Sequence, residues 1–179
     1  MRKWNGILSI AILALFLIHG IPGGFQLIGA GNIISKALAH TLLTLIAVHA
    51  VIGVYLTGKT LRIQKKTGAP YFRHNLLFWA RRLSGFLIMA LLFFHTTAFS
   101  DTSAAAYRLV WFDRAKLASQ ILLVISVGVH VIANARPALI TFGIRGLRKR
   151  AGDILFVMTV ILLFMAGAFI VYYLRWNQI

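Results

Sequence analysis

The stretch that decides the fold is Leu76–Phe99, LLFWARRLSGFLIMALLFFHTTAF, which is apolar over almost its whole length. The hydrocarbon core of a bilayer takes about 20 apolar residues as one helix, and this stretch is long enough to cross it. It also holds His95 deep within the apolar run. Ionisable side chains at membrane depth are costly and usually functional, so the stretch predicts a transmembrane helix that carries a candidate functional histidine.

The rest of the chain repeats this character. Hydrophobic residues make up 60% of the 179 residues and charged residues only 12%, far below the roughly 25% charged residues of soluble proteins. With no linker or repeat in the chain, we predict an all-α integral membrane protein with five transmembrane helices in a single domain, residues 1–179. Besides Leu76–Phe99, the segments are Gly6–Gly29, Ala37–Tyr55, Leu117–Ala135 and Ile154–Leu174.

The N-terminus resembles a signal peptide, because Arg2 and Lys3 precede an apolar run. The run is long for the apolar part of a signal peptide, however, and His19–Pro22 is not a cleavage site. We therefore predict that the segment stays as the first transmembrane helix. Tryptophans near the ends of the segments indicate membrane interfaces. They are Trp4, Trp79, Trp111 and Trp176.

The chain has nineteen Lys and Arg residues but only three acidic residues, none of them glutamate, so its net charge is +16. The basic residues lie between the apolar runs, so membrane topology explains them and no nucleic-acid partner is expected. By the positive-inside rule, the protein lies in the cytoplasmic (inner) membrane with its N-terminus inside and its C-terminus outside. The predicted inner side carries Arg2, Lys3, Lys59, Arg62, Lys65, Lys66, Arg73, Arg81, Arg82, Arg136, Arg145, Arg148, Lys149 and Arg150. The predicted outer side carries Lys36, Arg108, Arg114, Lys116 and Arg175.

The chain has no cysteine. This excludes disulfides, ligation of an iron–sulfur cluster by this chain and the thioether attachment of a c-type haem. No glycine-rich phosphate loop and no nucleophile beside a base is present either. Any haem must therefore be held by side-chain coordination alone.

Four histidines lie one to a segment in the first four segments: His19, His49, His95 and His130. His95 comes thirteen residues after Arg82 and His19 sixteen after Lys3, so both lie about 20 Å or more from the inner boundary. His49 and His130 lie toward the inner half by the same measure. Depth thus pairs His19 with His95 and His49 with His130, and each pair joins helices of like direction.

Such pairs lie diagonally across an up-down bundle of four helices, which leaves room for a flat macrocycle. We expect His19 and His95 to be the axial ligands of an outer b haem, and His49 and His130 those of an inner one. Haem iron with both axial positions filled transfers electrons. A zinc site would need more ligands at one depth, and a proton relay would need carboxylates. The alternative is neutral histidines hydrogen-bonded to neighbouring helices.

Three further residues are candidates for contacts with the haem propionates: Arg82, Arg136 and Ser84. Arg82 and Arg136 lie near the inner ends of their helices, where a guanidinium group can pair with a propionate. The alternative is that both arginines mark the level of the lipid headgroups. The basic stretch Lys59–Arg82 is a candidate for docking an acidic partner or anionic lipid, with topology as the plainer explanation.

With four histidines placed in this way, the chain resembles the single-subunit dihaem cytochrome b anchors of succinate:quinone oxidoreductases and quinol:fumarate reductases. The most specific similarity is Trp79-Ala-Arg-Arg-Leu-Ser-Gly-Phe followed by His95, and the next is Gly128-Val-His130. The resemblance implies five helices, two haem b groups and electron transfer between a partner and the quinone pool. The implied partners are flavoprotein and iron–sulfur subunits on the cytoplasmic side, in a complex able to dimerise. The quinone is expected to be menaquinone.

The chain departs from that family in its short Gly29–Lys36 connection and in having no glutamate for an outer quinol site. His40 and Asp101 are the candidates for the quinone site, and Asp113 is a further acidic residue in the same predicted outer loop as Asp101. Two alternatives stay open. One is the cytochrome b subunit of another dehydrogenase or reductase, such as a hydrogenase, a formate dehydrogenase or a disulfide reductase. The other is a haem-free transporter or structural membrane protein.

Overall fold

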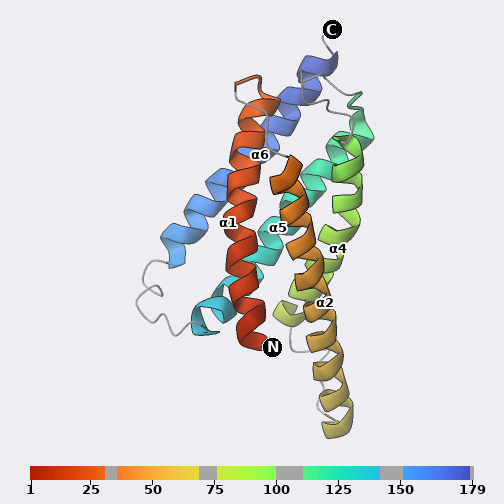
Figure 1. Ribbon diagram of the computed structural model, residues 1–179, viewed down its shortest axis with the longest axis vertical. Helices are drawn as coiled ribbons and strands as arrows, with labels where there is room; N and C mark the ends of the chain where they lie inside the picture. The colour runs from red at the N-terminus through yellow and green to blue at the C-terminus, as the bar shows by residue number, and fades with distance from the viewer. Residues whose placement is uncertain (31–35, 69–75, 100–110, 142–150, 178–179) are drawn as a thin grey trace.

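The computed structural model describes residues 1–30, 36–68, 76–99, 111–141 and 151–177, and the regular structure in these ranges is α-helical (Figure 1). In chain order the helices are α1 (Arg2–Leu27), α2 (Lys36–Thr67), α4 (Leu76–Ala98), α5 (Arg114–Thr141) and α6 (Ala151–Asn177). All of them are long and apolar enough, by length and composition, to cross a membrane. The predicted all-α class and its five membrane-spanning helices are confirmed at this level.

Local sequence explains where the helices begin and end. Gly29 (φ 85°) follows α1 and lets the Ala30 N–H bond the Phe25 carbonyl at 2.8 Å, the pattern of a left-handed glycine cap. Gly68 (φ 65°) follows α2, and its own N–H donates to the Gln64 carbonyl at 3.0 Å. At the start of α5 the Asp113 carboxylate accepts the Lys116 N–H at 2.8 Å, as an N-cap residue does.

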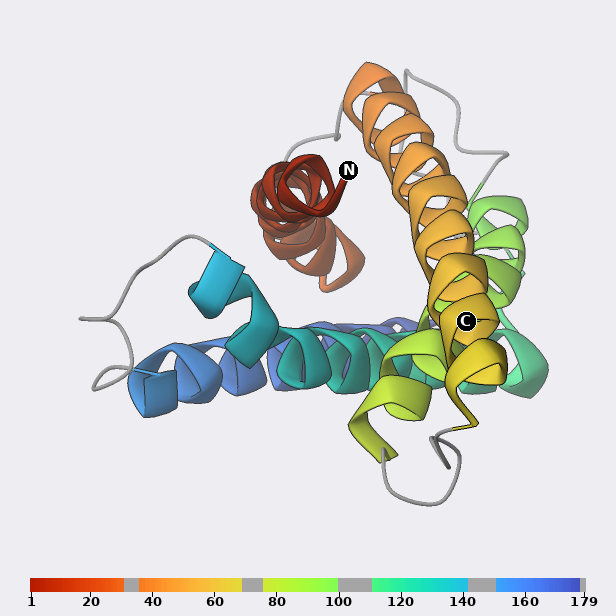
Figure 2. The same cartoon turned by 90° about the horizontal axis from the view of Figure 1, so that it is seen from below.

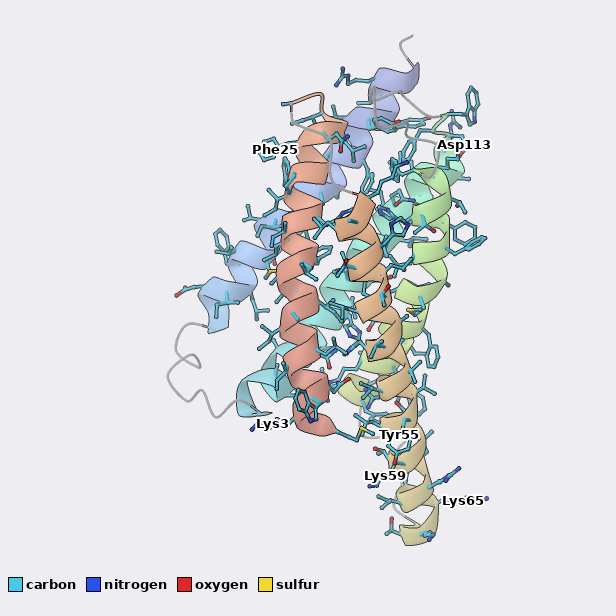
Figure 3. All side chains as sticks on the ribbon, in the orientation of Figure 1. Lys3, Phe25, Tyr55, Lys59, Lys65 and Asp113 are labelled. Carbon is cyan, nitrogen blue, oxygen red and sulfur yellow. The ribbon has the colours of Figure 1, made fainter. Side chains whose placement is uncertain are left out.

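Helix α2 is longer than its apolar segment requires. Its 32 residues extend about 48 Å, well beyond a hydrocarbon core of about 30 Å. The surplus lies after Tyr55, and it projects past Lys3 with Lys59 and Lys65 on it (Figure 3). We name this end of the molecule the basic end, and the opposite end, which carries Phe25 and Asp113, the far end (Figure 3).

Successive helices run in opposite directions, and the termini lie at opposite ends (Figure 1). The most extensive contact joins α4 and α5, and further close contacts join α5 with α6, α6 with α1, and α1 with α2. Neither α1 with α4 nor α2 with α5 is among the closely packed pairs. Seen from below, α1 and the first part of α2 lie on one side of the layer that α5 and α6 form, and the other end of α2 overlaps this layer in the view (Figure 2).

The buried core is small and lies at the far end. It consists of Leu27, Phe112, Ala168, Phe169 and Tyr172. About half of the other large apolar side chains along the helices are exposed, as expected of surfaces that face lipid. Of the buried apolar side chains in the described ranges, only Leu27 and Leu42 belong to α1 and α2, so α4, α5 and α6 form the better packed part.

Candidate functional site

The structure brings the four intramembrane histidines together as two pairs. The ring centroids of His19 and His95 lie 6.2 Å apart, with their planes at 76°. Those of His49 and His130 lie 6.3 Å apart, at 85°. Each pair takes one ring from the α1–α2 side and one from the α4–α5 side. All four rings are half-buried.

The pair at the far end is bounded by an aromatic wall and an amide. Phe99 and Phe169 lie 5.3 and 6.5 Å from the His95 ring, centroid to centroid. Phe99 in turn contacts Phe112 and Tyr172 of the buried core. On the other side, Nδ1 of His95 lies 2.7 Å from Oε1 of Gln120, a residue of α5 with no exposed surface.

The hydrogen bonds around Gln120 have only one consistent direction. The Ser119 hydroxyl donates to the Lys116 carbonyl at 2.7 Å, so its oxygen is left to accept from Nε2 of Gln120 at 3.1 Å. The amide therefore turns its carbonyl oxygen toward His95. A carbonyl oxygen only accepts, so Nδ1 of His95 carries the proton and Nε2 is left with a lone pair.

The pair near the basic end has a similar arrangement. Nδ1 of His130 lies 3.0 Å from the Ser84 hydroxyl, whose own hydrogen is donated to the Ala80 carbonyl one turn earlier. Ser84 therefore accepts from Nδ1 of His130, and Nε2 is again the free nitrogen. Gly85 lies directly against the same ring: a Cβ atom there would come 3.4 Å from Cε1 of His130.

The two histidine pairs lie at separate levels along the bundle axis, and residue spacings along α4 and along α5 each give the distance between them. Along α4, His95 comes eleven residues after Ser84, the partner of His130, a rise of about 16 Å. Along α5, His130 comes ten residues after Gln120, the partner of His95, a rise of about 15 Å. The sites are thus stacked along the bundle, one in each half.

The spacing of the rings fits one metal atom between each pair. A metal–imidazole bond of about 2.0 Å plus roughly 1.1 Å from a ring nitrogen to its centroid, counted on both sides, gives about 6.2 Å. The observed separations are 6.2 and 6.3 Å. A direct hydrogen bond between the rings, even a long one of about 3.5 Å, would hold the centroids within about 5.7 Å. The rings are therefore too far apart to bond each other.

Hydrogen bonding to a neighbouring helix does not account for His19 and His49 either. Nδ1 of each is buried and has no hydrogen-bond partner within the described part of the chain. Nor do three or more His, Asp or Glu residues gather at a metal-binding spacing in those same ranges. Each pair is thus suited to a metal that brings its other ligands with it, as haem iron does.

Comparison with models of protein families, with curated proteins and with solved structures gives no match.

The other residues predicted from the sequence to contact a haem or a quinone lie outside the two histidine pairs. Arg82 lies with its guanidinium 4.9 Å from the Phe78 ring centroid and is an electrostatic neighbour of both His49 and His130. His40 is exposed on the outward face of α2, away from His49. Asp113 caps α5. Asp101 and the side chain of Arg136 lie outside the described residues.

Glycines near the histidines divide into two groups. Gly20 and Gly24 pack against Met165 and Phe164 of α6, and Gly128 against Leu162 of the same helix. These are ordinary close helix contacts, whereas Gly85 borders the His130 ring. The residue that sequence reasoning missed is Gln120. An uncharged amide within an apolar segment is a signal that could have found it, because a polar group at that depth needs a partner.

Proposed function

We propose that the chain is a dihaem cytochrome b that carries electrons across the membrane to or from a quinone. The proposal is supported above all by one observation, the separation of 6.2 and 6.3 Å within the two histidine pairs. That spacing would let the two imidazoles of each pair hold one iron between them. The first four membrane-spanning helices, α1, α2, α4 and α5, would form the bundle around both haems, and α6 would pack outside it.

The chain's own residues would hold the haems and tune them. His19 and His95 would hold one haem, and His49 and His130 would hold the other. Held by two histidines each, the bound groups would supply one-electron transfer. The aromatic wall of Phe99 and its neighbours would exclude water from the far site.

Arg82 is the best candidate for a propionate partner at the basic-end site. The positive charge of Arg82 lies near enough to interact with both His49 and His130. A guanidinium group also pairs well with a carboxylate. Arg136 is the second candidate by its place in the sequence. Ser84 was a third, but its hydroxyl is engaged by the Ala80 carbonyl and the His130 ring, so we assign it to His130.

We further propose that the basic end is cytoplasmic, which places the His49–His130 haem inside and the His19–His95 haem outside. The exposed Lys59, Arg62, Lys65 and Lys66 on the projecting end of α2 would face an acidic partner. By the resemblance, that partner is a flavoprotein and iron–sulfur pair of the succinate dehydrogenase or fumarate reductase type. Identifying the subunits that co-purify with the native chain tests this assignment and separates it from other dehydrogenases.

The haem proposal is tested by replacing single histidines. His95→Ala and His130→Ala in the full chain should each remove absorbance of one haem from the reduced-minus-oxidised spectrum. His40→Ala is the matched control, because His40 is exposed on α2 and should leave both haems in place. Unchanged spectra in both ligand variants, or a wild-type chain without haem absorbance, would overturn the proposal.

Quinone, expected to be menaquinone, would react at the lipid-exposed edge of the far end. His40 is the described candidate there, since it is exposed on α2 and an imidazole can both accept and donate a proton. In the assembled complex, His40→Gln should keep both haems reducible by the partner but lower quinone turnover at least tenfold. Unchanged turnover would remove His40 from the quinone site without touching the haem proposal.

A further inference from the structure

The α4–α5 pair supports its two histidines reciprocally. His95 belongs to α4, and its partner Gln120 belongs to α5. His130 belongs to α5, and its partner Ser84 belongs to α4. Each helix thus provides a ligand at one level and the support for the other helix's ligand at the second level. No corresponding support for Nδ1 of His19 or His49 exists among the described residues.

Both supports fix the same tautomer. Gln120 turns Oε1 toward His95 because its Nε2 donates to Ser119, and an amide oxygen can only accept. The Ser84 oxygen accepts from His130 because the Ser84 hydrogen is donated to the Ala80 carbonyl. Both Nδ1 atoms therefore carry protons, and both Nε2 atoms keep the lone pair that a metal needs. Gln120 is fully buried and Ser84 is 6% exposed, so neither bond competes with bulk water.

We propose that Gln120 and Ser84 are positioning residues, each holding the tautomer and orientation of one haem ligand and tuning the reduction potential of one haem. The inference rests on the proposed function. A stronger acceptor at Nδ1–H makes an imidazole a better electron donor to its metal, and ligand basicity rises with such outer-shell bonds. Better donation stabilises ferric over ferrous iron and lowers the reduction potential.

The chemistry therefore predicts opposite shifts for two changes at Gln120. Gln120→Glu keeps the shape and presents a carboxylate to His95, so the potential of the far haem should fall. Gln120→Leu keeps similar bulk but removes the acceptor, so the same potential should rise. Ser84→Ala should raise the potential of the other haem. Ser126→Ala is the matched control, because this serine of α5 is similarly buried, at 4% exposed. Among the described residues its hydroxyl donates only to the Leu122 carbonyl of its own helix.

The experiment is a redox titration of the full purified chain, followed by haem absorbance, for the wild type and these four variants. The expected result is one component that moves in opposite directions in Gln120→Glu and Gln120→Leu, a different component that moves in Ser84→Ala, and no movement in Ser126→Ala. Where Gln120→Leu fails to assemble, the isosteric Gln120→Glu decides alone: a lower potential of one component supports the inference, and an unchanged or higher one overturns it.

A general effect on packing would give another pattern. Shifts of the same sign in both Gln120 variants, shifts of both haems together, or an equal shift in Ser126→Ala would overturn the assignment of Gln120 and Ser84. These results would leave the haem proposal standing. A wild-type chain with no haem absorbance would instead remove the proposed function itself.

Discussion

Arg81 replaces a hydrogen bond that α5 lacks near the His130 site. Pro137 lies inside α5 and has no N–H, so it cannot bond the Ala133 carbonyl four residues earlier. Nε of Arg81 donates to that carbonyl at 2.8 Å across the α4–α5 contact. A hydrogen bond from a charged donor contributes about 1.5–3 kcal/mol in water, but bonds between membrane helices average about 0.6 and reach about 1.7 kcal/mol. Because Arg81 is half-buried and Ala133 is buried, we expect Arg81→Met to lower the free energy of unfolding by about 1.5 kcal/mol.

A double-mutant cycle isolates this bond. Pro137→Ala restores an N–H to α5, so the Ala133 carbonyl no longer depends on Arg81. In the Pro137→Ala background, Arg81→Met should cost no more than about 0.5 kcal/mol, which leaves a coupling energy of about 1 kcal/mol. Reversible unfolding in mixed micelles, followed by circular dichroism, measures both costs. Lys59→Met is the control, because Lys59 is exposed and should show no coupling to Pro137. An equal cost of Arg81→Met in both backgrounds would refute the reasoning.

Three other predictions concern the site and the topology. Gly85→Leu should lose one haem, because a Cβ there would already lie 3.4 Å from Cε1 of His130 and a longer side chain would displace the ring. Gly58→Leu should keep both, since Gly58 is exposed on α2, lies on the face opposite His49 and has nothing within 4 Å of a Cβ. Retention of both haems in Gly85→Leu would contradict this packing. The ring planes in each pair cross at 76° and 85°, so the oxidised chain should give strongly anisotropic low-spin electron paramagnetic resonance signals, and rhombic signals would contradict crossed planes. An impermeant thiol reagent added to intact cells should label Ala115→Cys and not Gly68→Cys, and the reverse would invert the proposed orientation.

The parts of the fold that composition governs could be predicted from the sequence. Long apolar runs fix five helices, because a bilayer leaves the backbone few other ways to satisfy its polar groups. Charged residues do not limit helix length in the same way, so α2 continues to Thr67, well past the predicted end at Tyr55. Helix packing was harder to predict from the sequence, because contacts such as that of Gly24 with Phe164 depend on which face each helix turns toward its neighbour.

The same contrast holds for the candidate site. Counting residues from the charged boundaries gave the depth of His95 and His130, and depth is enough to choose their partners. The supports of these rings depend on rotation about the helix axis as well as on depth, and one sequence does not fix that rotation. Gln120 was therefore missed, and Ser84 was assigned to a propionate although its hydroxyl contacts His130.

The most direct test of the account is the number of haems per chain. The wild-type chain is purified, its haem is measured as the pyridine haemochrome, and its protein is measured by quantitative amino-acid analysis. Two histidine pairs at the spacing of trans ligands predict about two haems b per chain, all extractable by acidic solvent because no cysteine can bind them covalently. A ratio of one would contradict one of the two sites, and a ratio of zero would contradict the account as a whole.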